Sequence, residues 1–118
     1  MSNAGSDAED WAAQWLAQRG LTVVARNYRC RAGELDIVAS DQRSLIFIEV
    51  RLRSHPGFGG AAASVTPAKQ RRLLRAAQHF LSTRPRWADM PCRFDVIALD
   101  APQSVPTQAR WIRAAFTA

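Results

Sequence analysis

The stretch GELDIVASDQRSLIFIEVRLR, residues 33–53, decides the fold because it holds two apolar runs separated by a short polar segment. The runs ELDIVA (34–39) and SLIFIEVRL (44–52) are rich in residues that favour strands, and SDQR between them is typical of a hairpin turn. The second run is apolar on both strand faces over its first half, as a central strand should be. The stretch therefore predicts a β-hairpin whose second strand lies inside a sheet.

Charged side chains interrupt both runs. Because successive strand side chains point to opposite faces, Glu34 and Asp36 share one face, and Glu49 shares another with Arg51. If the hairpin aligns Asp36 near Glu49, two like charges meet, which requires a raised pKa or a bound cation. Oxygen ligands of this kind suit Mg²⁺ or Mn²⁺. The pattern predicts a carboxylate metal site near the end of the central strand.

The alternative to a metal is that these carboxylates form structural ion pairs. For Asp36 and Glu49 the candidate partners are three nearby arginines, namely Arg29, Arg51 and Arg53. Glu34 either pairs with an arginine such as Arg31 or supports the metal ligands from outside. The residues alone leave these alternatives open.

The remaining elements are predicted from periodicity and turn residues. They are a helix at 7–19, a strand at 21–25, a Gly-rich loop at 54–60, a helix at 66–81, and strands at 93–99 and 109–116. Thr66 followed by Pro67 is a strong helix start, with Thr66 as the N-cap residue. The order is helix, three strands, helix, two strands, which predicts an α/β fold with a mixed central sheet flanked by helices.

The predicted helix at 66–81 has an apolar face and a basic face. The apolar face comprises Leu73, Ala76, Ala77, Phe80 and Leu81, and the opposite face comprises Arg71, Arg72, Arg75 and His79. Lys69 and Gln70, in the first turn, fall on the apolar side and should reach toward the polar end of the sheet. Lys69 is the only lysine in the chain. The arginine face is either a phosphate-binding surface or an ordinary solvated helix face.

The charge balance favours a polyanionic partner. The chain has 16 basic and 10 acidic residues, a net charge of +6 and a sequence pI of 10.9. Nucleic acid is favoured over a membrane because no basic amphipathic segment carries a large aromatic face. Fifteen of the 16 basic residues are Arg, which a GC-rich genome would also explain. With no apolar run near the roughly 18 residues of a membrane span, we expect a cytoplasmic chain.

Asp36 followed after a gap by EVR (49–51) resembles the PD-(D/E)xK nuclease signature. More closely, a set of segments resembles the YraN-type family of bacterial endonuclease-like proteins, relatives of archaeal Holliday-junction resolvases; the segments are GSDAEDWAAQWLAQRG, RNYRCRAGELDIVA, IFIEVRLR, TPAKQRRLLRAAQHFL and RFDVIAL. The resemblance implies a restriction-endonuclease-like core. We expect residues 5–118 to form a single nuclease-like domain, and MSNA (1–4) to be a cloning remnant.

The resemblance also implies roles for individual residues. Asp36 and Glu49 would be metal ligands, with the backbone carbonyl of Val50 as a third, and Glu9 of the first helix would join the site. Glu9 lies at the edge of the apolar arc of its helix, which agrees with this role. The competing interpretation is that Ser6 and Glu9 form a capping box.

Position 51 departs from the family pattern because it holds Arg where the superfamily usually has Lys. Arg51 can stabilise charge but cannot readily give up a proton, so Lys69 is a candidate for the missing cation. The expected activity is Mg²⁺- or Mn²⁺-dependent cleavage of DNA, including branched or junction DNA, with Glu9, Asp36, Glu49 and Arg51 as catalytic residues. The expected nucleic-acid contacts are Arg53, Lys69, Gln70, Arg71, Arg72 and Arg75.

Two further expectations concern alternatives and assembly. The alternative function is a catalytically decayed nuclease fold that binds nucleic acid without cleaving it. Junction resolution would require two sites related by two-fold symmetry, so a homodimer is the assembly that this substrate implies. The choice between DNA and RNA stays open from the sequence.

Overall fold

The hairpin predicted from residues 33–53 forms the middle of the sheet. Strand β2 (Gly33–Ser40) pairs antiparallel with β3 (Leu45–Arg53), from Ile37 opposite Ile48 to Ser40 opposite Leu45. In the turn, the carboxylate of Asp41 accepts hydrogen bonds from the backbone N–H groups of Arg43 and Ser44 at 3.0 and 2.8 Å. This local bonding explains why the short polar segment reverses the chain.

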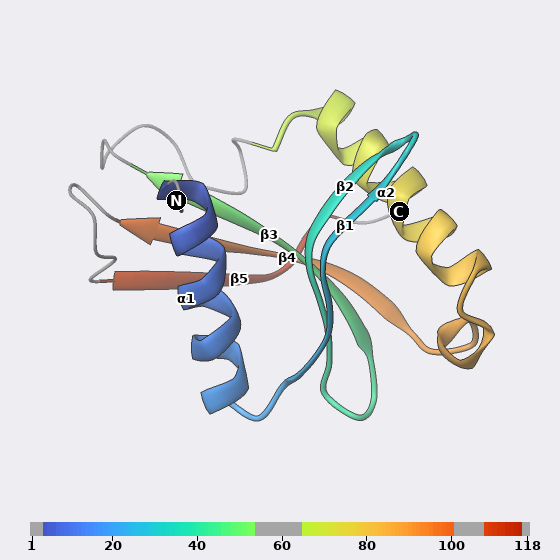
Figure 1. The fold of residues 1–118 in the computed structure, drawn as a ribbon, viewed down its shortest axis with the longest axis horizontal. Coiled ribbons are helices and arrows are strands. Elements are labelled where there is room, and N and C mark those ends of the chain that lie inside the picture. The colour runs from blue at the N-terminus through green and yellow to red at the C-terminus, as the bar shows by residue number, and fades with distance from the viewer. Residues whose placement is uncertain (1–3, 54–64, 101–107, 117–118) are drawn as a thin grey trace.

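The computed structural model describes residues 4–53, 65–100 and 108–116 (Figure 1). Besides β2 and β3, the elements are α1 (Ala4–Gln18), β1 (Thr22–Cys30), α2 (Pro67–Ser82), the 3₁₀ turn η2 (Pro85–Trp87), β4 (Cys92–Asp100) and β5 (Gln108–Phe116). The expected loop at 54–60 lies outside the described residues, as do residues 1–3 of the expected cloning remnant.

The five strands form one mixed sheet in the order β1-β2-β3-β4-β5. Strands β3 and β4 are parallel, and the connection between them contains α2, while the other neighbours are antiparallel. The predicted α/β fold is therefore confirmed, and the arrangement is compatible with a restriction-endonuclease-like core.

The two helices cover opposite faces of the sheet (Figure 1). Ile46 and Ile48 of β3 pack in one core with α1, and Leu45 and Phe47 pack in the other with α2. The alternation predicted for the central strand is confirmed, because both of its faces are buried. Within the described residues, neither helix is both long and apolar enough to cross a membrane.

The first two elements differ in extent from the prediction. Helix α1 begins at Ala4 rather than at residue 7, so Ser6 lies inside the helix and cannot be its N-cap residue; the capping-box interpretation of Glu9 is wrong. Strand β1 runs to Cys30 rather than to residue 25, because its backbone continues to pair with β2 as far as Cys30 opposite Gly33. Its side chains are mostly exposed or half-buried, so no apolar pattern announces this extension.

Helix α2 begins as predicted. The side-chain oxygen of Thr66 accepts a hydrogen bond from the backbone N–H of Lys69 at 3.2 Å, and Pro67 occupies the first turn. Four residues of the predicted apolar face are buried in the helix, namely Leu73, Ala76, Ala77 and Phe80. This N-terminal cap fixes where the first turn of α2 stands over the sheet.

Candidate metal centre

Three carboxylates from two elements converge at one place. Glu9 of α1 and Glu34 and Asp36 of β2 each offer an oxygen, and these oxygens all lie within 4.8 Å of one another. Glu9 and Asp36 are half-buried and Glu34 is exposed. Strand alternation brings Glu34 and Asp36 to one side of β2, and Glu9 reaches them from α1.

Asp36 is oriented by the backbone of the neighbouring strand. Its Oδ2 atom accepts a hydrogen bond from the Val50 N–H at 2.9 Å, just beyond the first β2–β3 pair, Ile37 opposite Ile48. Val50 thus meets Asp36 through its amide. The role of the Val50 carbonyl as a metal ligand stays a prediction.

The electrostatics of the cluster disfavour having all of its carboxylates ionised. Burial, and then the charges of Glu49, Glu9 and Glu34, raise the pKa of Asp36 to about 7, although the Val50 N–H opposes this shift. Burial and then the charge of Glu34 also raise the pKa of Glu9, while Arg26 opposes. Without a cation, crowded carboxylates of this kind retain protons near neutral pH. A divalent cation would remove that conflict.

Glu49 lies close to two cationic side chains, Lys69 and Arg51, as the sequence predicts. Its carboxylate is buried, with a side chain 7% exposed, and its Oε1 atom lies 2.9 Å from Nζ of Lys69 and 3.7 Å from NH1 of Arg51. Glu49 also contributes the largest charge effect on the pKa of Asp36, so the two carboxylates are neighbours. The site therefore has an acidic side at Glu9, Glu34 and Asp36 and a cationic side at Lys69 and Arg51.

The first turn of α2 supplies two of the predicted phosphate contacts, and they behave differently. Lys69 reaches the polar end of β3, in agreement with its predicted direction. Gln70 instead donates a hydrogen bond from Nε2 to the backbone carbonyl of Val65 at 2.9 Å, so its amide holds the segment that leads into the helix. This hydrogen bond uses one N–H of the Gln70 amide, and a contact of Gln70 with nucleic acid stays a prediction.

The other expected nucleic-acid contacts lie on α2 and at the end of β3. Arg71, Arg72 and Arg75 are exposed on α2, as a phosphate-binding face would require. Arg53 is the last residue of β3, and its side chain lies outside the described part of the chain. A role for these arginines stays a prediction.

Glu34 is the residue that sequence reasoning left least defined. Its carboxylate lies 3.4 Å from Nε of Arg29, its partner across the β1–β2 ladder, rather than pairing with Arg31. The two side chains are 42% and 76% exposed, so solvent weakens this pair and it does not hold Glu34 away from the cluster. Alternation with Asp36 was the signal that pointed to Glu34.

Known bacterial proteins match this chain over nearly its whole length. The profile described as "Uncharacterised protein family UPF0102" matches residues 8–99. A UPF0102 protein of Alcanivorax borkumensis is 49% identical over 114 residues, covering 97% of this chain and 91% of the relative. A UPF0102 protein of Pseudomonas entomophila is 50% identical over 115 residues, covering 98% and 94%.

A third relative, a UPF0102 protein of Ralstonia nicotianae, is 54% identical over 117 residues, covering 95% of this chain and 85% of the relative. The chain belongs to the UPF0102 family, and the predicted membership of the YraN-type family is confirmed. The family description assigns no activity.

Proposed function

We propose that this protein is a divalent-metal-dependent endonuclease that hydrolyses phosphodiester bonds of DNA, branched DNA included. The observation that carries the proposal is the convergence of Glu9, Glu34 and Asp36 beside the Glu49–Lys69 ion pair. Acidic ligands next to a cation are the arrangement that phosphodiester hydrolysis needs, because the substrate brings a negative charge that grows in the transition state.

The donor set fits Mg²⁺ or Mn²⁺. Oxygens are the only side-chain donors in the cluster, and these hard cations take one or two carboxylates while keeping several waters. Asp36 and Glu9 would hold the ion, with Glu34 or Glu49 completing the set. Once bound, such an ion neutralises phosphate charge and lowers the pKa of a coordinated water.

The cationic side of the site has a separate task. Lys69 and Arg51 both approach the Glu49 carboxylate, so they bring positive charge to the place where a phosphate would lie. Arg51 would act through its charge and its hydrogen bonds rather than as a base. Lys69 brings from α2 the amine that position 51 lacks.

The surface charge supports a nucleic-acid substrate. The net charge of +6 and the exposed Arg71, Arg72 and Arg75 of α2 would attract a phosphate backbone. The resemblance to relatives of junction resolvases favours DNA and, within DNA, branched forms.

Calorimetric titration of Mn²⁺ into the parent protein and into Asp36→Asn tests the metal centre. The parent should bind, and the variant should lose binding. Asp10→Asn is a matched control, because Asp10 is an exposed carboxylate next to Glu9 in sequence that pairs with Arg26 at 2.6 Å outside the cluster. Equal binding by the parent and Asp36→Asn would contradict the site.

Cleavage of fluorescent four-way junction, flap and duplex DNA then tests the activity. The parent should cut at least one of them with Mg²⁺ or Mn²⁺, and Asp36→Asn should bind DNA without cutting. One observation favours a second function, namely binding without cleavage: Arg51 stands where the superfamily usually has Lys. That function predicts salt-dependent DNA binding that needs no divalent ion and is weakened by Arg71→Ala or Arg75→Ala.

A further inference from the structure

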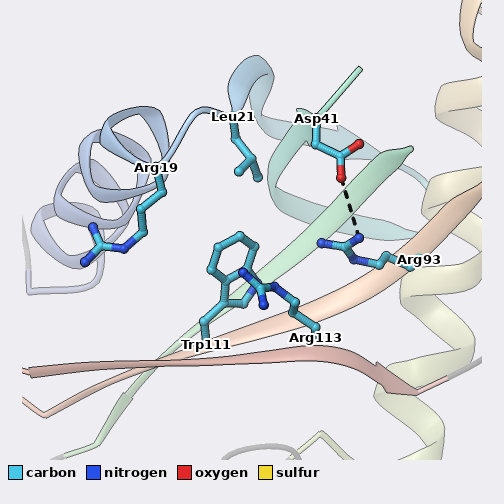
Figure 2. Close-up of a pocket in the computed structure, with 6 residues that line it drawn as sticks. All are labelled: Arg19, Leu21, Asp41, Arg93, Trp111 and Arg113. Atoms are coloured by element: carbon cyan, nitrogen blue, oxygen red, sulfur yellow. Dashed lines mark ion pairs between the residues drawn. The ribbon is translucent and has the colours of Figure 1, made fainter. Parts of the chain in front are cut away.

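A second concave site lies away from the carboxylates. A pocket of about 720 Å³ is lined by Arg19, Leu21, Asp41, Arg93, Trp111 and Arg113 (Figure 2). Arg19 follows the last residue of α1 and stands ten residues after Glu9, so the rise of the helix separates their backbones by about 15 Å. The pocket is therefore distinct from the candidate metal centre.

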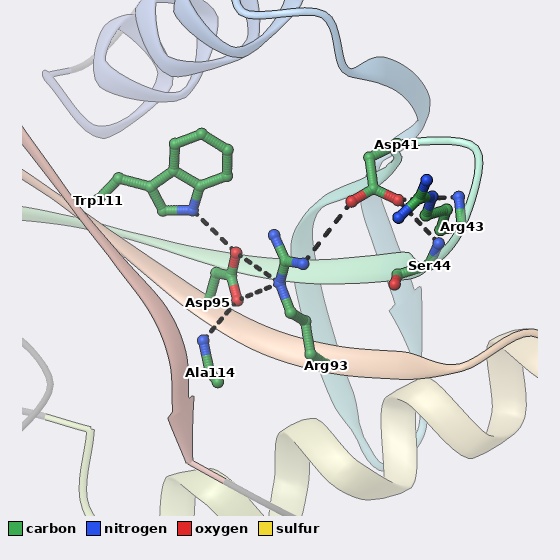
Figure 3. Close-up of polar contacts among 7 residues, drawn as sticks. All are labelled: Asp41, Arg43, Ser44, Arg93, Asp95, Trp111 and Ala114. Carbon is green, nitrogen blue, oxygen red and sulfur yellow. Dashed lines mark hydrogen bonds and ion pairs between the residues drawn. The ribbon is translucent and has the colours of Figure 1, made fainter.

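The aromatic wall of this pocket is held in one orientation by a buried carboxylate. Asp95 of β4 is 0% exposed, and its Oδ2 atom accepts a hydrogen bond from the indole N–H of Trp111 at 2.8 Å (Figure 3). Nε of Arg93 donates to both oxygens of Asp95 at 3.1 and 3.2 Å. Trp111 thus has a fixed ring position although it stands on the outermost strand.

The backbone of β5 is bent to complete this network. Ala114 has a φ of 49°, a conformation that costs energy for any residue with a Cβ atom, and its N–H donates to Oδ1 of Asp95 at 2.9 Å. The β4–β5 pairing shifts register between Phe94 and Val96, beside Asp95. Backbone strain persists where surrounding structure enforces it, and it concentrates at functional sites.

One of the three arginines that line the pocket, Arg93, is paired with carboxylates. Arg93 is matched by two carboxylates, Asp95 and, at 3.7 Å, Asp41. Arg19 and Arg113 form no ion pair with a carboxylate in the part of the chain that the structure describes. Arg19 donates one hydrogen bond from NH1 to the backbone carbonyl of Trp15 at 3.3 Å, which leaves its other N–H groups, and those of Arg113, available to an anion.

Both available guanidinium groups rest on a connected aromatic surface. The guanidinium of Arg19 lies 3.6 Å from the ring centroid of Trp15, and that of Arg113 lies 4.2 Å from the ring of Trp111. The two indole rings meet edge to face, with centroids 5.9 Å apart. A ligand in the pocket would thus meet cations and an aromatic face together.

We propose that this pocket binds a nucleotide unit, with its phosphate on Arg113 and its base against Trp111 and Leu21. Arg19 lies at the rim, with its guanidinium directed away from Trp111 (Figure 2). Guanidinium groups match phosphate oxygens in geometry and charge, and aromatic side chains stack on any base. The volume lies in the range of small-ligand sites. A free mononucleotide and one nucleotide of a strand present the same chemistry. This binding requires neither a divalent ion nor cleavage.

The test follows the indole N–H resonance of Trp111 by NMR, assigned by its loss in Trp111→Phe, with a chelator present. The probes are thymidine 5′-monophosphate, thymidine, inorganic phosphate and 5′-phosphorylated trithymidylate. Both nucleotide probes should shift this resonance. Arg113→Ala should weaken the binding about tenfold or more, and Arg19→Ala should weaken it by less. Tighter binding of the trinucleotide would identify a strand as the source, and equal affinity would identify a free mononucleotide.

Arg86→Ala is the matched control, because Arg86 is another exposed arginine over a tryptophan, 4.8 Å from the ring of Trp87 in η2. It should leave the affinity unchanged. An unmoved Trp111 resonance at millimolar nucleotide, equal affinity for inorganic phosphate and nucleotide, or the same loss in Arg86→Ala would each overturn the proposal. Asp36→Asn should bind nucleotide like the parent, so failure of this proposal is distinguishable from failure of the metal centre.

Discussion

Nζ of Lys69 lies 2.9 Å from Oε1 of Glu49, which joins the first turn of α2 to the polar end of the central strand β3. The Glu49 side chain is 7% exposed and that of Lys69 is 30% exposed, so this is a partly buried ion pair open to a ligand on one side. The crossover helix α2 thus brings an amine to the Glu49 carboxylate, whereas position 51, two residues further along β3, holds Arg.

Replacement of Lys69 by Gln should lower DNA cleavage by roughly a hundredfold, because a positive charge that stabilises the transition state is lost. Lys69→Arg should retain most of the activity if charge is what matters. Single-turnover cleavage of a labelled substrate measures both variants. Parental activity in Lys69→Gln would show that Lys69 serves only as the structural partner of Glu49.

The raised pKa of Asp36 makes the stability of the metal-free protein fall with rising pH. The folded protein keeps this proton up to about pH 7, whereas the unfolded chain loses it near the ordinary aspartate pKa of 3.8. The loss of stability is roughly 1.4 kcal/mol per pH unit within that window. Urea unfolding with a chelator should show the decline between pH 4 and 7 in the parent and a smaller one in Asp36→Asn. Parallel curves for the two proteins would exclude the shift.

Binding of Mn²⁺ should release protons, because the ligands must be deprotonated to coordinate the ion. The release should be substantial near pH 6, below the pKa of Asp36, and small well above pH 7. Calorimetry in two buffers of different ionisation enthalpy counts these protons. Asp10→Asn should release as many as the parent, and a pH-independent count in the parent would contradict the prediction.

Glu34→Gln should weaken Mn²⁺ binding, by about tenfold if Glu34 ligates the ion or orients a ligand. The reason is that its carboxylate oxygen lies within 4.8 Å of those of Glu9 and Asp36. Glu9→Gln should have an effect of the same sign. If Glu34→Gln binds Mn²⁺ as tightly as the parent, Glu34 has no role in the metal centre and serves only as the exposed ion-pair partner of Arg29.

Asp95→Asn should destabilise the fold by about 3 kcal/mol or more. The change removes the negative charge that faces Arg93, and it places an amide NH₂ group, itself a donor, opposite the donors of Arg93, Trp111 and Ala114. Urea unfolding at constant pH measures this loss. Asp41→Asn is the comparison, since the Asp41 side chain is 31% exposed and 3.7 Å from Arg93. A loss in Asp95→Asn no larger than that in Asp41→Asn would contradict the role of the network.

The parts of the fold that could be predicted are those with strong local signals. Two apolar runs predict the hairpin at 33–53, and Thr66 with Pro67 predicts the start of α2. The extension of β1 was missed because an edge strand with few buried side chains is held by backbone pairing, which leaves no apolar pattern. The early start of α1 likewise carries no sharp local signal.

The candidate site divides in the same way. Helical periodicity predicted that Lys69 reaches the polar end of β3, and strand periodicity predicted that Glu34 shares a face with Asp36. In the structure Lys69 contacts Glu49 of β3, and the carboxylates of Glu34 and Asp36 lie close together. The approach of Glu9 came from the family resemblance rather than from local pattern. The bonding of Asp95 to Trp111 and Ala114 depends on a register shift between two strands, which residue types alone do not encode.

The uniqueness of Lys69 gives the protein a built-in chemical reporter. Since this is the only lysine, an acylating reagent meets a single side-chain amine in the whole chain, and that amine stands 2.9 Å from Glu49. The mass added at this one position then measures how far the Glu49 carboxylate, an ion or a phosphate shields the amine. The labelling yield of Lys69 therefore reports how far the candidate metal centre is occupied, and it can be measured without a cleavage assay.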